Sequence, residues 1–171
     1  MIFKLLGITL IMVSSSLIGF GFFECMSSRE RELRNLSDAV SSMINELDYS
    51  LDAVKFLFQK ALPTVKGDVF ELFEKITEYI AEGKSANEAW SISVREKAAV
   101  MCLTKSDCNF LVNCADAFSA HEVQQQKSQL KGLQSRILVL ADAAAEAKRK
   151  NGKLVQILGV YGGVFLCAVL F

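Results

Sequence analysis

LLGITLIMVSSSLIGFGFF, residues 5–23, decides the fold, because nineteen consecutive residues carry no charged side chain. A second uncharged stretch, LVQILGVYGGVFLCAVLF, covers the 18 residues 154–171. A helix needs about 20 mostly apolar residues to cross a hydrocarbon core of roughly 30 Å. We therefore expect two transmembrane helices, over 1–23 and 154–171, that contact a lipid bilayer on either side of a soluble domain over 24–153.

The basic residues near these stretches predict which side of the membrane the domain faces. Lys4 is the one basic residue at an end of an apolar stretch that points away from the domain. The ends that adjoin the domain carry seven basic residues: Arg29, Arg31, Arg34, Lys148, Arg149, Lys150 and Lys153. Lys and Arg near the ends of membrane spans are retained in the cytoplasm. We therefore predict a cytoplasmic domain with both termini outside. The net charge is zero, which argues against a nucleic-acid partner, since that would need a basic surface.

A cleaved signal peptide is the main alternative for the first stretch. Signal peptides have an apolar core of about 7–15 residues and a small-x-small cleavage pattern. The apolar stretch here is longer, and its exit reads Gly-Phe-Phe-Glu-Cys over residues 21–25. Phe23 and Glu24 also fit a lipoprotein site at Cys25 poorly. We therefore predict an uncleaved anchor.

The middle of the chain predicts an all-α domain. It has a single proline, Pro63, and almost no alternating β-branched run. Apolar residues at steps of three and four mark a helix that packs on another helix; they are Leu33, Leu36, Val40, Met43 and Leu47. We expect a six-helix bundle with helices over about 28–49, from 51 to Pro63, over 68–82, after Ser85, over 106–118, and from 122 to 152 or on into the membrane. Because both membrane stretches leave from one face, we expect the first and last helices to form a long antiparallel stalk, with the short helices bundled at its far end.

Local signals mark several helix ends. In a capping box a Ser hydroxyl and a Glu carboxylate satisfy the free amides of the first helical turn. The candidates are Ser27–Glu30, Ser85–Glu88 and Ser119–Glu122. Gly83 is the expected stop of the 68–82 helix. The expected inward residues of that helix are Val69, Phe70, Phe73, Ile76 and Ile80.

No pattern in the chain predicts catalysis, a cofactor or a metal. The sequence holds neither GxxxxGK[ST] for a nucleotide phosphate nor a GxSxG nucleophile elbow. His121 has no second histidine beside it, so we expect a solvated turn residue. The spacing of the cysteines does not fit zinc, and a reducing cytoplasm favours free thiols; they are Cys25, Cys102, Cys108, Cys114 and Cys167.

Small residues in the apolar stretches predict close helix packing. Ser15 and Gly19 lie four residues apart in the first stretch, as do Gly159 and Gly163 in the second. Such pairs let helices approach closely in lipid, although small residues are also common in membrane helices generally.

Two features of the domain each leave two interpretations open. Trp90 follows Ala89 at a helix start and is either a core residue or an exposed anchor for a partner. A glutamine-rich face is either simply solvated or binds a partner; it comprises Gln124, Gln125, Gln126, Gln129 and Gln134.

Several short motifs follow one another along the chain. They are Lys4–Gly7 with Ser15 to Phe20 in the first span, Arg29–Leu36, which holds Arg31 and Arg34, the Glu82–Trp90 turn with Gly83, Ser85, Glu88 and Trp90, Gln126, and Lys153–Gly162. Their order and spacing resemble the stage III sporulation protein AB family of endospore-forming Firmicutes over nearly the whole chain, and the first span looks like that family's first span. The family tends to have Leu-Gly-x-x-Asp before the long helix, whereas residues 118–121 here read Phe-Ser-Ala-His, so no role is carried over to that turn.

The resemblance implies a function that the composition does not. The family belongs to a membrane complex that joins mother cell and forespore after engulfment, and the implied location is the mother-cell membrane around the forespore. Its soluble domain is similar to the cytoplasmic domains of platform proteins in type II secretion and type IV pilus machines. The implied partners are a secretion-type ATPase and other sporulation channel proteins, and the implied role is non-enzymatic. The alternative is a membrane-anchored helical adaptor outside sporulation.

Overall fold

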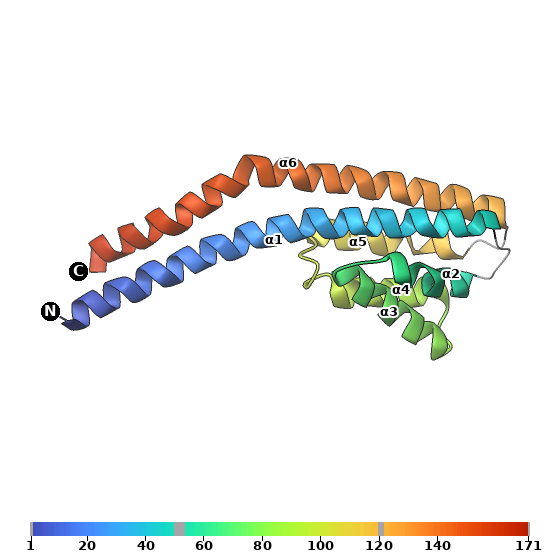
Figure 1. Ribbon diagram of the computed structural model, residues 1–171, viewed down its shortest axis with the longest axis horizontal. Helices are drawn as coiled ribbons and strands as arrows, with labels where there is room; N and C mark the ends of the chain where they lie inside the picture. The colour runs from blue at the N-terminus through green and yellow to red at the C-terminus, as the bar shows by residue number, and fades with distance from the viewer. Residues whose placement is uncertain (1, 50–53, 120–121, 171) are drawn as a thin grey trace. The chain divides into compact units, whose positions relative to one another are not determined.

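The protein is all-helical in the residues that the structure describes, which are 2–49, 54–119 and 122–170 of a computed structural model (Figure 1). This confirms the predicted all-α class. In chain order the elements are α1 (Ile2–Tyr49), α2 (Val54–Ala61), the 3₁₀ helix η1 (Leu62–Thr64), α3 (Asp68–Ala81), α4 (Ala86–Lys97), α5 (Lys105–Asn113), the 3₁₀ helix η2 (Ala115–Phe118) and α6 (Val123–Leu170).

The first and last helices are longer than predicted. Each has 48 residues and runs without a break from an apolar stretch into the domain. The predicted capping box at Ser27 and Glu30 is therefore wrong, because the helix is already formed on its N-terminal side and leaves no free amides there. The last helix was predicted either to end at residue 152 or to continue into the apolar stretch, and α6 does continue into that stretch.

The chain forms two compact units. One, the apolar unit, takes in α1 as far as Ser28 and α6 from Ala143 onward, and the other, the bundle unit, covers Arg29–Asp142. These boundaries lie inside the predicted 24–153 domain, so the bundle unit is shorter than that domain. The predicted domain limits at 23 and 154 follow the apolar composition and stay a prediction.

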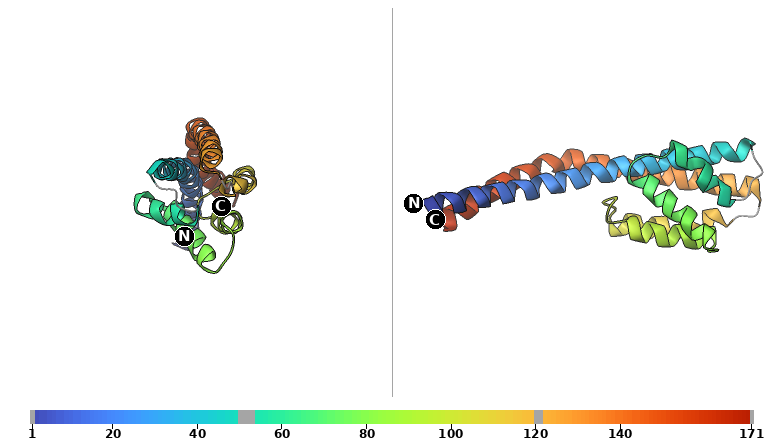
Figure 2. Two further views of the ribbon diagram at one scale, coloured as in Figure 1. Left: turned by 90° about the vertical axis from the view of Figure 1, so that its right-hand side faces the viewer. Right: turned by 60° about the horizontal axis from the view of Figure 1, so that its bottom comes forward.

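In the bundle unit, α1 and α6 lie side by side and antiparallel (Figure 1 and Figure 2). Arg34 on α1 contacts Asp142 on α6, with 3.2 Å between guanidinium nitrogen and carboxylate oxygen. The five α1 residues at steps of three and four are all buried, as predicted. The α6 residues of this unit that are buried at the same spacing are Leu130, Leu133, Ile137 and Ala141.

An aromatic cluster fills the core of the short helices. Trp90 is fully buried, and its ring centroid lies 4.7 Å from that of Phe118. Phe58 lies 5.4 Å from Phe73 and 5.0 Å from Phe118. The Trp90 indole Nε1 donates a hydrogen bond of 2.7 Å to the Leu111 carbonyl. Trp90 is therefore a core residue, and exposure as a partner anchor is excluded in this fold.

The inward face of α3 differs at two positions from the prediction. Val69, Phe73 and Ile76 are buried as expected, but Phe70 is 40% exposed and Ile80 is only partly buried. Leu72, which was not predicted, is buried. The buried set follows i, i+3, i+4 and i+7 from Val69, which is one stripe of a 3.6-residue helix, and Phe70 lies about 100° around the helix from Val69, off that stripe.

The ends of α3, α4 and α5 are marked by local sequence signals, not all of which were predicted. Gly83 has φ of 96° just after α3, as a stop residue should, and the Ser85–Glu88 capping box is present. A second box, formed by Thr104 and Asp107, begins α5 and was not predicted. The predicted 106–118 helix is instead α5 followed by η2. The candidate box at Ser119 depends on residues 120–121, outside the described residues.

Candidate functional site

The apolar unit brings the four predicted small residues together. A Cβ atom on Gly159 would lie 2.9 Å from the Gly19 Cα, and one on Gly163 would lie 3.0 Å from the Ser15 Cβ. The Ser15 hydroxyl donates a hydrogen bond to the Gly159 carbonyl. Gly159 approaches the backbone of Gly19, and Gly163 approaches the side chain of Ser15, distances that only small residues permit.

The contact continues along both helices and is antiparallel. The Cys167 thiol lies 3.8 Å from the Ile8 carbonyl oxygen, and a Cβ on Gly152 would lie 3.0 Å from the Phe23 ring. Residue numbers thus rise on α1 as they fall on α6. The small residues are part of one continuous helix–helix contact.

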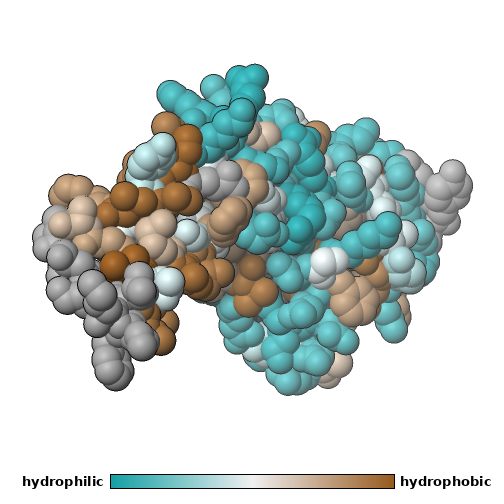
Figure 3. Space-filling model, turned by 60° about the vertical axis from the view of Figure 1, so that its left-hand side comes forward, coloured by the Kyte–Doolittle hydropathy of each residue, from teal (hydrophilic) through white to brown (hydrophobic). Residues whose placement is uncertain are grey.

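The face of this helix pair that Figure 3 shows is largely apolar where its residues are coloured by hydropathy. An exposed apolar patch of more than a few hundred Å² marks an interaction or membrane site. Over Leu6–Leu47 the chain is long and apolar enough to cross a membrane, the one such segment found among the described residues. The exposed side chains include Leu6, Leu10, Val13, Leu17, Ile18, Phe20 and Phe22 on α1, and Leu154, Ile157, Leu158, Tyr161, Val164 and Phe165 on α6.

We expect Gly159→Leu to separate the two apolar helices. A side chain there meets the Gly19 backbone, which cannot move aside cheaply, so the contact should weaken by about 1–3 kcal/mol or more. Oxidative cross-linking of Ile8→Cys to the native Cys167 measures the contact by gel mobility. The control is Gly21→Leu, because a Cβ at Gly21 meets nothing within 4 Å. Equal cross-linking yields in both variants would contradict the observed packing.

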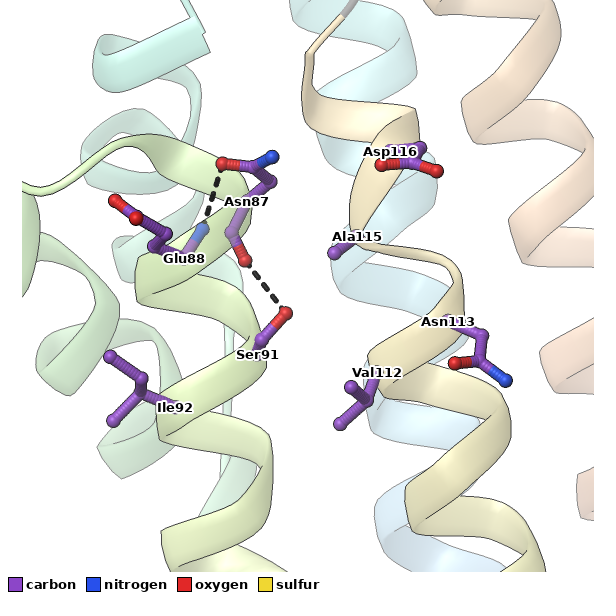
Figure 4. Close-up of a pocket in the computed structure, with 8 residues that line it drawn as sticks. All are labelled: Asn87, Glu88, Ser91, Ile92, Val112, Asn113, Ala115 and Asp116. Atoms are coloured by element: carbon purple, nitrogen blue, oxygen red, sulfur yellow. Dashed lines mark hydrogen bonds between the residues drawn. The ribbon is translucent and has the colours of Figure 1, made fainter.

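A polar groove lies between α4 and the α5–η2 segment of the bundle unit (Figure 4). Its volume is about 410 Å³. Figure 4 shows Asn87, Glu88 and Ser91 on the α4 wall and Asn113 and Asp116 on the opposite wall. The groove therefore begins at the Ser85–Glu88 turn that the sequence singled out.

Hydrogen bonds fix the α4 wall of the groove. The Ser85 hydroxyl and Ser85 amide both bond the Glu88 carboxylate, and these bonds lower its pKa below the ordinary value of 4.5. The Asn87 side-chain oxygen accepts from the Glu88 amide at 2.9 Å. Glu88 therefore stays ionised at neutral pH. Asp116, on the other side of the groove, is also exposed, and Figure 4 shows the Glu88 carboxylate on the side of α4 away from Asp116.

The described residues offer no metal cluster. Within those ranges, no group of three or more His, Cys, Asp or Glu side chains is placed to hold a metal ion. His121 lies outside the described residues. Cys108, Cys114 and Cys167 are free thiols, as expected, and burial raises the pKa of the Cys114 thiol. Cys25 and Cys102 are each disulfide-bonded, so the expectation of five free thiols is wrong for these two.

Arg29 forms an ion pair with Asp107 in the bundle unit. Its Nε and one terminal nitrogen lie 2.7 Å and 3.0 Å from the two Asp107 oxygens, and the Asp107 side chain is 1% exposed. Asp107 also accepts from the Thr104 amide at 2.9 Å. Burial pushes the pKa of Asp107 up, but the bonds from Arg29 and Thr104 outweigh burial and hold the pKa below its usual range. Sequence reasoning missed Asp107, although the spacing Thr104-x-x-Asp107 is that of a capping box.

The remaining predicted interaction residues also contact the chain itself. Arg31 lies 3.0 Å from Glu32, a fully buried carboxylate that accepts from the Val69 amide as well. Arg34 reaches Glu30 in addition to Asp142. Gln126 is 4% exposed with its Nε2 unpaired in the described structure, whereas Gln124 and Gln125 are exposed. The structure thus gives most of these residues an intramolecular role; whether a partner also contacts them stays a prediction.

An apolar helix pair together with a helical bundle that carries a polar groove is the architecture of an all-helical protein that associates with a membrane.

Comparison with known proteins then gives the family. A family model described as "Stage III sporulation protein AB (spore_III_AB)" matches residues 4–171, and the chain belongs to this family. The chain is 26% identical over 168 residues to the stage III sporulation protein AB of Bacillus subtilis (strain 168), covering 98% of each chain. A solved structure of stage III sporulation protein AB (SpoIIIAB) matches with a TM-score of 0.64 and 22% identity, over 72% of this chain and 98% of that one. The family resemblance read from the motifs is thereby confirmed, and membership indicates a role in sporulation.

Proposed function

We propose that the chain is a non-enzymatic assembly component of the sporulation membrane complex that links mother cell and forespore. Both apolar ends span the mother-cell membrane around the forespore, the bundle unit is cytoplasmic and both termini lie outside. The supporting observation is the antiparallel contact of the two apolar segments through Ser15, Gly19, Gly159 and Gly163. Two paired apolar helices in lipid keep their backbone polar groups satisfied internally, as a membrane requires.

The bundle unit would provide the docking surface for a secretion-type ATPase. Two observations support the groove beside α4 as the contact. Its lining includes exposed carboxylates from two separate helical segments, Glu88 and Asp116, and the Ser85–Glu88 capping box fixes the first turn of α4 beside it. A preorganised anionic groove binds a cationic partner residue with little ordering cost. The other sporulation channel proteins would meet the apolar unit within the membrane.

The test of this function is binding of the full-length protein, in nanodiscs, to the ATPase of the same complex. We expect measurable binding, and we expect Asp116→Lys to weaken it at least about tenfold, because it places like charge against the cationic contact. The matched control is Glu74→Lys, which reverses an exposed carboxylate on α3. Absence of binding by the unaltered protein would contradict ATPase docking, and equal effects of both variants would contradict the groove.

A membrane-anchored adaptor outside sporulation remains the second candidate. Such an adaptor would have the same membrane anchoring and the same helical bundle but would not bind an ATPase. Family membership favours the sporulation complex, and the binding experiment separates the two.

A further inference from the structure

Three cations at the edge of the apolar unit form what we call the basic band, defined as Arg149, Lys150 and Lys153 on α6. All three are exposed, and none has an ion-pair partner among the described residues. Lys153 lies four residues from Arg149 and three from Lys150, so the three side chains share one side of the helix. Like charges at this spacing repel one another.

The carboxylate nearest to this band in sequence is Glu146, three residues before Arg149 and four before Lys150, and no ion pair joins it to either cation in the described residues. Glu146 is the last acidic residue, and residues 147–171 contain neither Asp nor Glu. Elsewhere many exposed cations do have carboxylate partners, such as Lys60 with Glu46 and Lys97 with Glu71. The band is therefore a concentration of positive charge in which no cation is held in an ion pair within the described structure.

The band adjoins the apolar outer surface directly. Leu154 follows Lys153 and is 57% exposed, and Leu158, one turn further, is 74% exposed. A cationic turn followed by an exposed apolar stretch matches the order of layers in a bilayer, where headgroup phosphates lie beside the hydrocarbon. Arg forms two parallel hydrogen bonds to a phosphate, and Lys extends its ammonium along its aliphatic stem toward the headgroups.

We infer that the basic band binds the headgroup phosphates of anionic phospholipids. The inference rests on the proposed anchoring, since it needs the apolar surface to lie in a bilayer. It adds a lipid class to that anchoring: the bilayer next to α6 is enriched in phosphatidylglycerol-like lipids over zwitterionic ones.

The experiment uses the full chain in symmetric phosphatidylcholine vesicles with trace spin-labelled lipids. Electron paramagnetic resonance gives the ratio of association constants for phosphatidylglycerol and phosphatidylcholine. We expect several-fold preference for phosphatidylglycerol at 0.1 M salt, with each cation contributing up to about fivefold. The triple variant Arg149→Gln, Lys150→Gln, Lys153→Gln should bring the ratio close to one, and 1 M salt should reduce it in the unaltered protein.

The control triple is Lys66→Gln, Arg95→Gln, Lys105→Gln, three exposed bundle cations that also lack an ion-pair partner in the described structure. It removes the same charge and should keep the preference. Loss of the preference in the control, its absence in the unaltered protein, or its abolition by inorganic phosphate at matched ionic strength would overturn the inference. Resistance to alkaline carbonate is measured first: an extracted chain contradicts the anchoring and the inference together, whereas a retained chain without preference contradicts the inference alone.

Discussion

Trp90→Ala should lower the free energy of unfolding of the bundle by about 3–5 kcal/mol, the range for truncating a buried aromatic residue. Trp90 is fully buried among Phe58 and Phe118, so its removal leaves a cavity between helices that cannot collapse onto it. The Leu111 carbonyl also loses its bond from the indole. Calorimetry of the full-length protein in detergent should show the bundle transition at a much lower temperature, or no transition.

Two variants make this result interpretable. Phe56→Ala truncates an aromatic residue that is 53% exposed and should change the melting temperature little. Trp90→Phe keeps a ring in the cluster but loses the hydrogen bond. Its melting temperature should lie between those of Trp90→Ala and Phe56→Ala. An unchanged transition in Trp90→Ala would mean that the aromatic cluster does not hold the short helices together.

Asp107→Asn should cost the bundle about 3–5 kcal/mol, the range for removing one partner of a buried ion pair. It leaves the Arg29 guanidinium, which is 19% exposed, without its carboxylate. Because the pKa of Asp107 is lowered below its ordinary 3.8 in the folded protein, the ionised group stabilises the fold above that value. The contribution is lost as the pH falls through the folded pKa.

The measurement is the difference in melting temperature between the unaltered protein and Asp107→Asn as a function of pH. The difference should be constant from about pH 5 to 8 and narrow below about pH 4. Glu74→Gln removes an exposed charge and should leave the melting temperature nearly unchanged. The double variant Arg29→Gln, Asp107→Asn should recover part of the loss, because no unpaired cation is then left buried. A difference that did not depend on pH would show that Asp107 acts through packing rather than charge.

Periodic apolar patterns predicted the fold well where burial of an apolar helix face is the main stabilising effect. Leu33, Leu36 and Val40 are buried on α1 because helix pairing needs only a regular apolar stripe, which can be read from residue spacing. The prediction for Phe70 is wrong because it followed hydrophobicity rather than spacing: Phe70 lies about 100° around the helix from Val69 and therefore off the buried stripe.

The candidate sites were less predictable, since they depend on pairs far apart in sequence. Ser85 and Glu88 are local, and their box could be read directly. The partner of Arg29 is 78 residues away, and no local rule links it to Asp107. The groove also depends on residues far apart in sequence, because Glu88 and Asp116 line one groove only once α4 and η2 have packed.

The Ser15–Gly159 contact has a consequence for how the protein is made. Its two sides are separated by 144 positions in the chain. A ribosome adds about 5–20 residues per second, so roughly 7–29 seconds pass between the synthesis of one side and that of the other. During that interval the N-terminal helix, if already inserted as proposed, has no packing partner on α6. Its Ser15 hydroxyl can instead donate a hydrogen bond to the carbonyl four residues earlier, at Ile11. Packing of α6 then replaces this local hydrogen bond with the one to the Gly159 carbonyl. Until translation ends, the small-residue face of the newly inserted helix is accessible to helices of other membrane proteins.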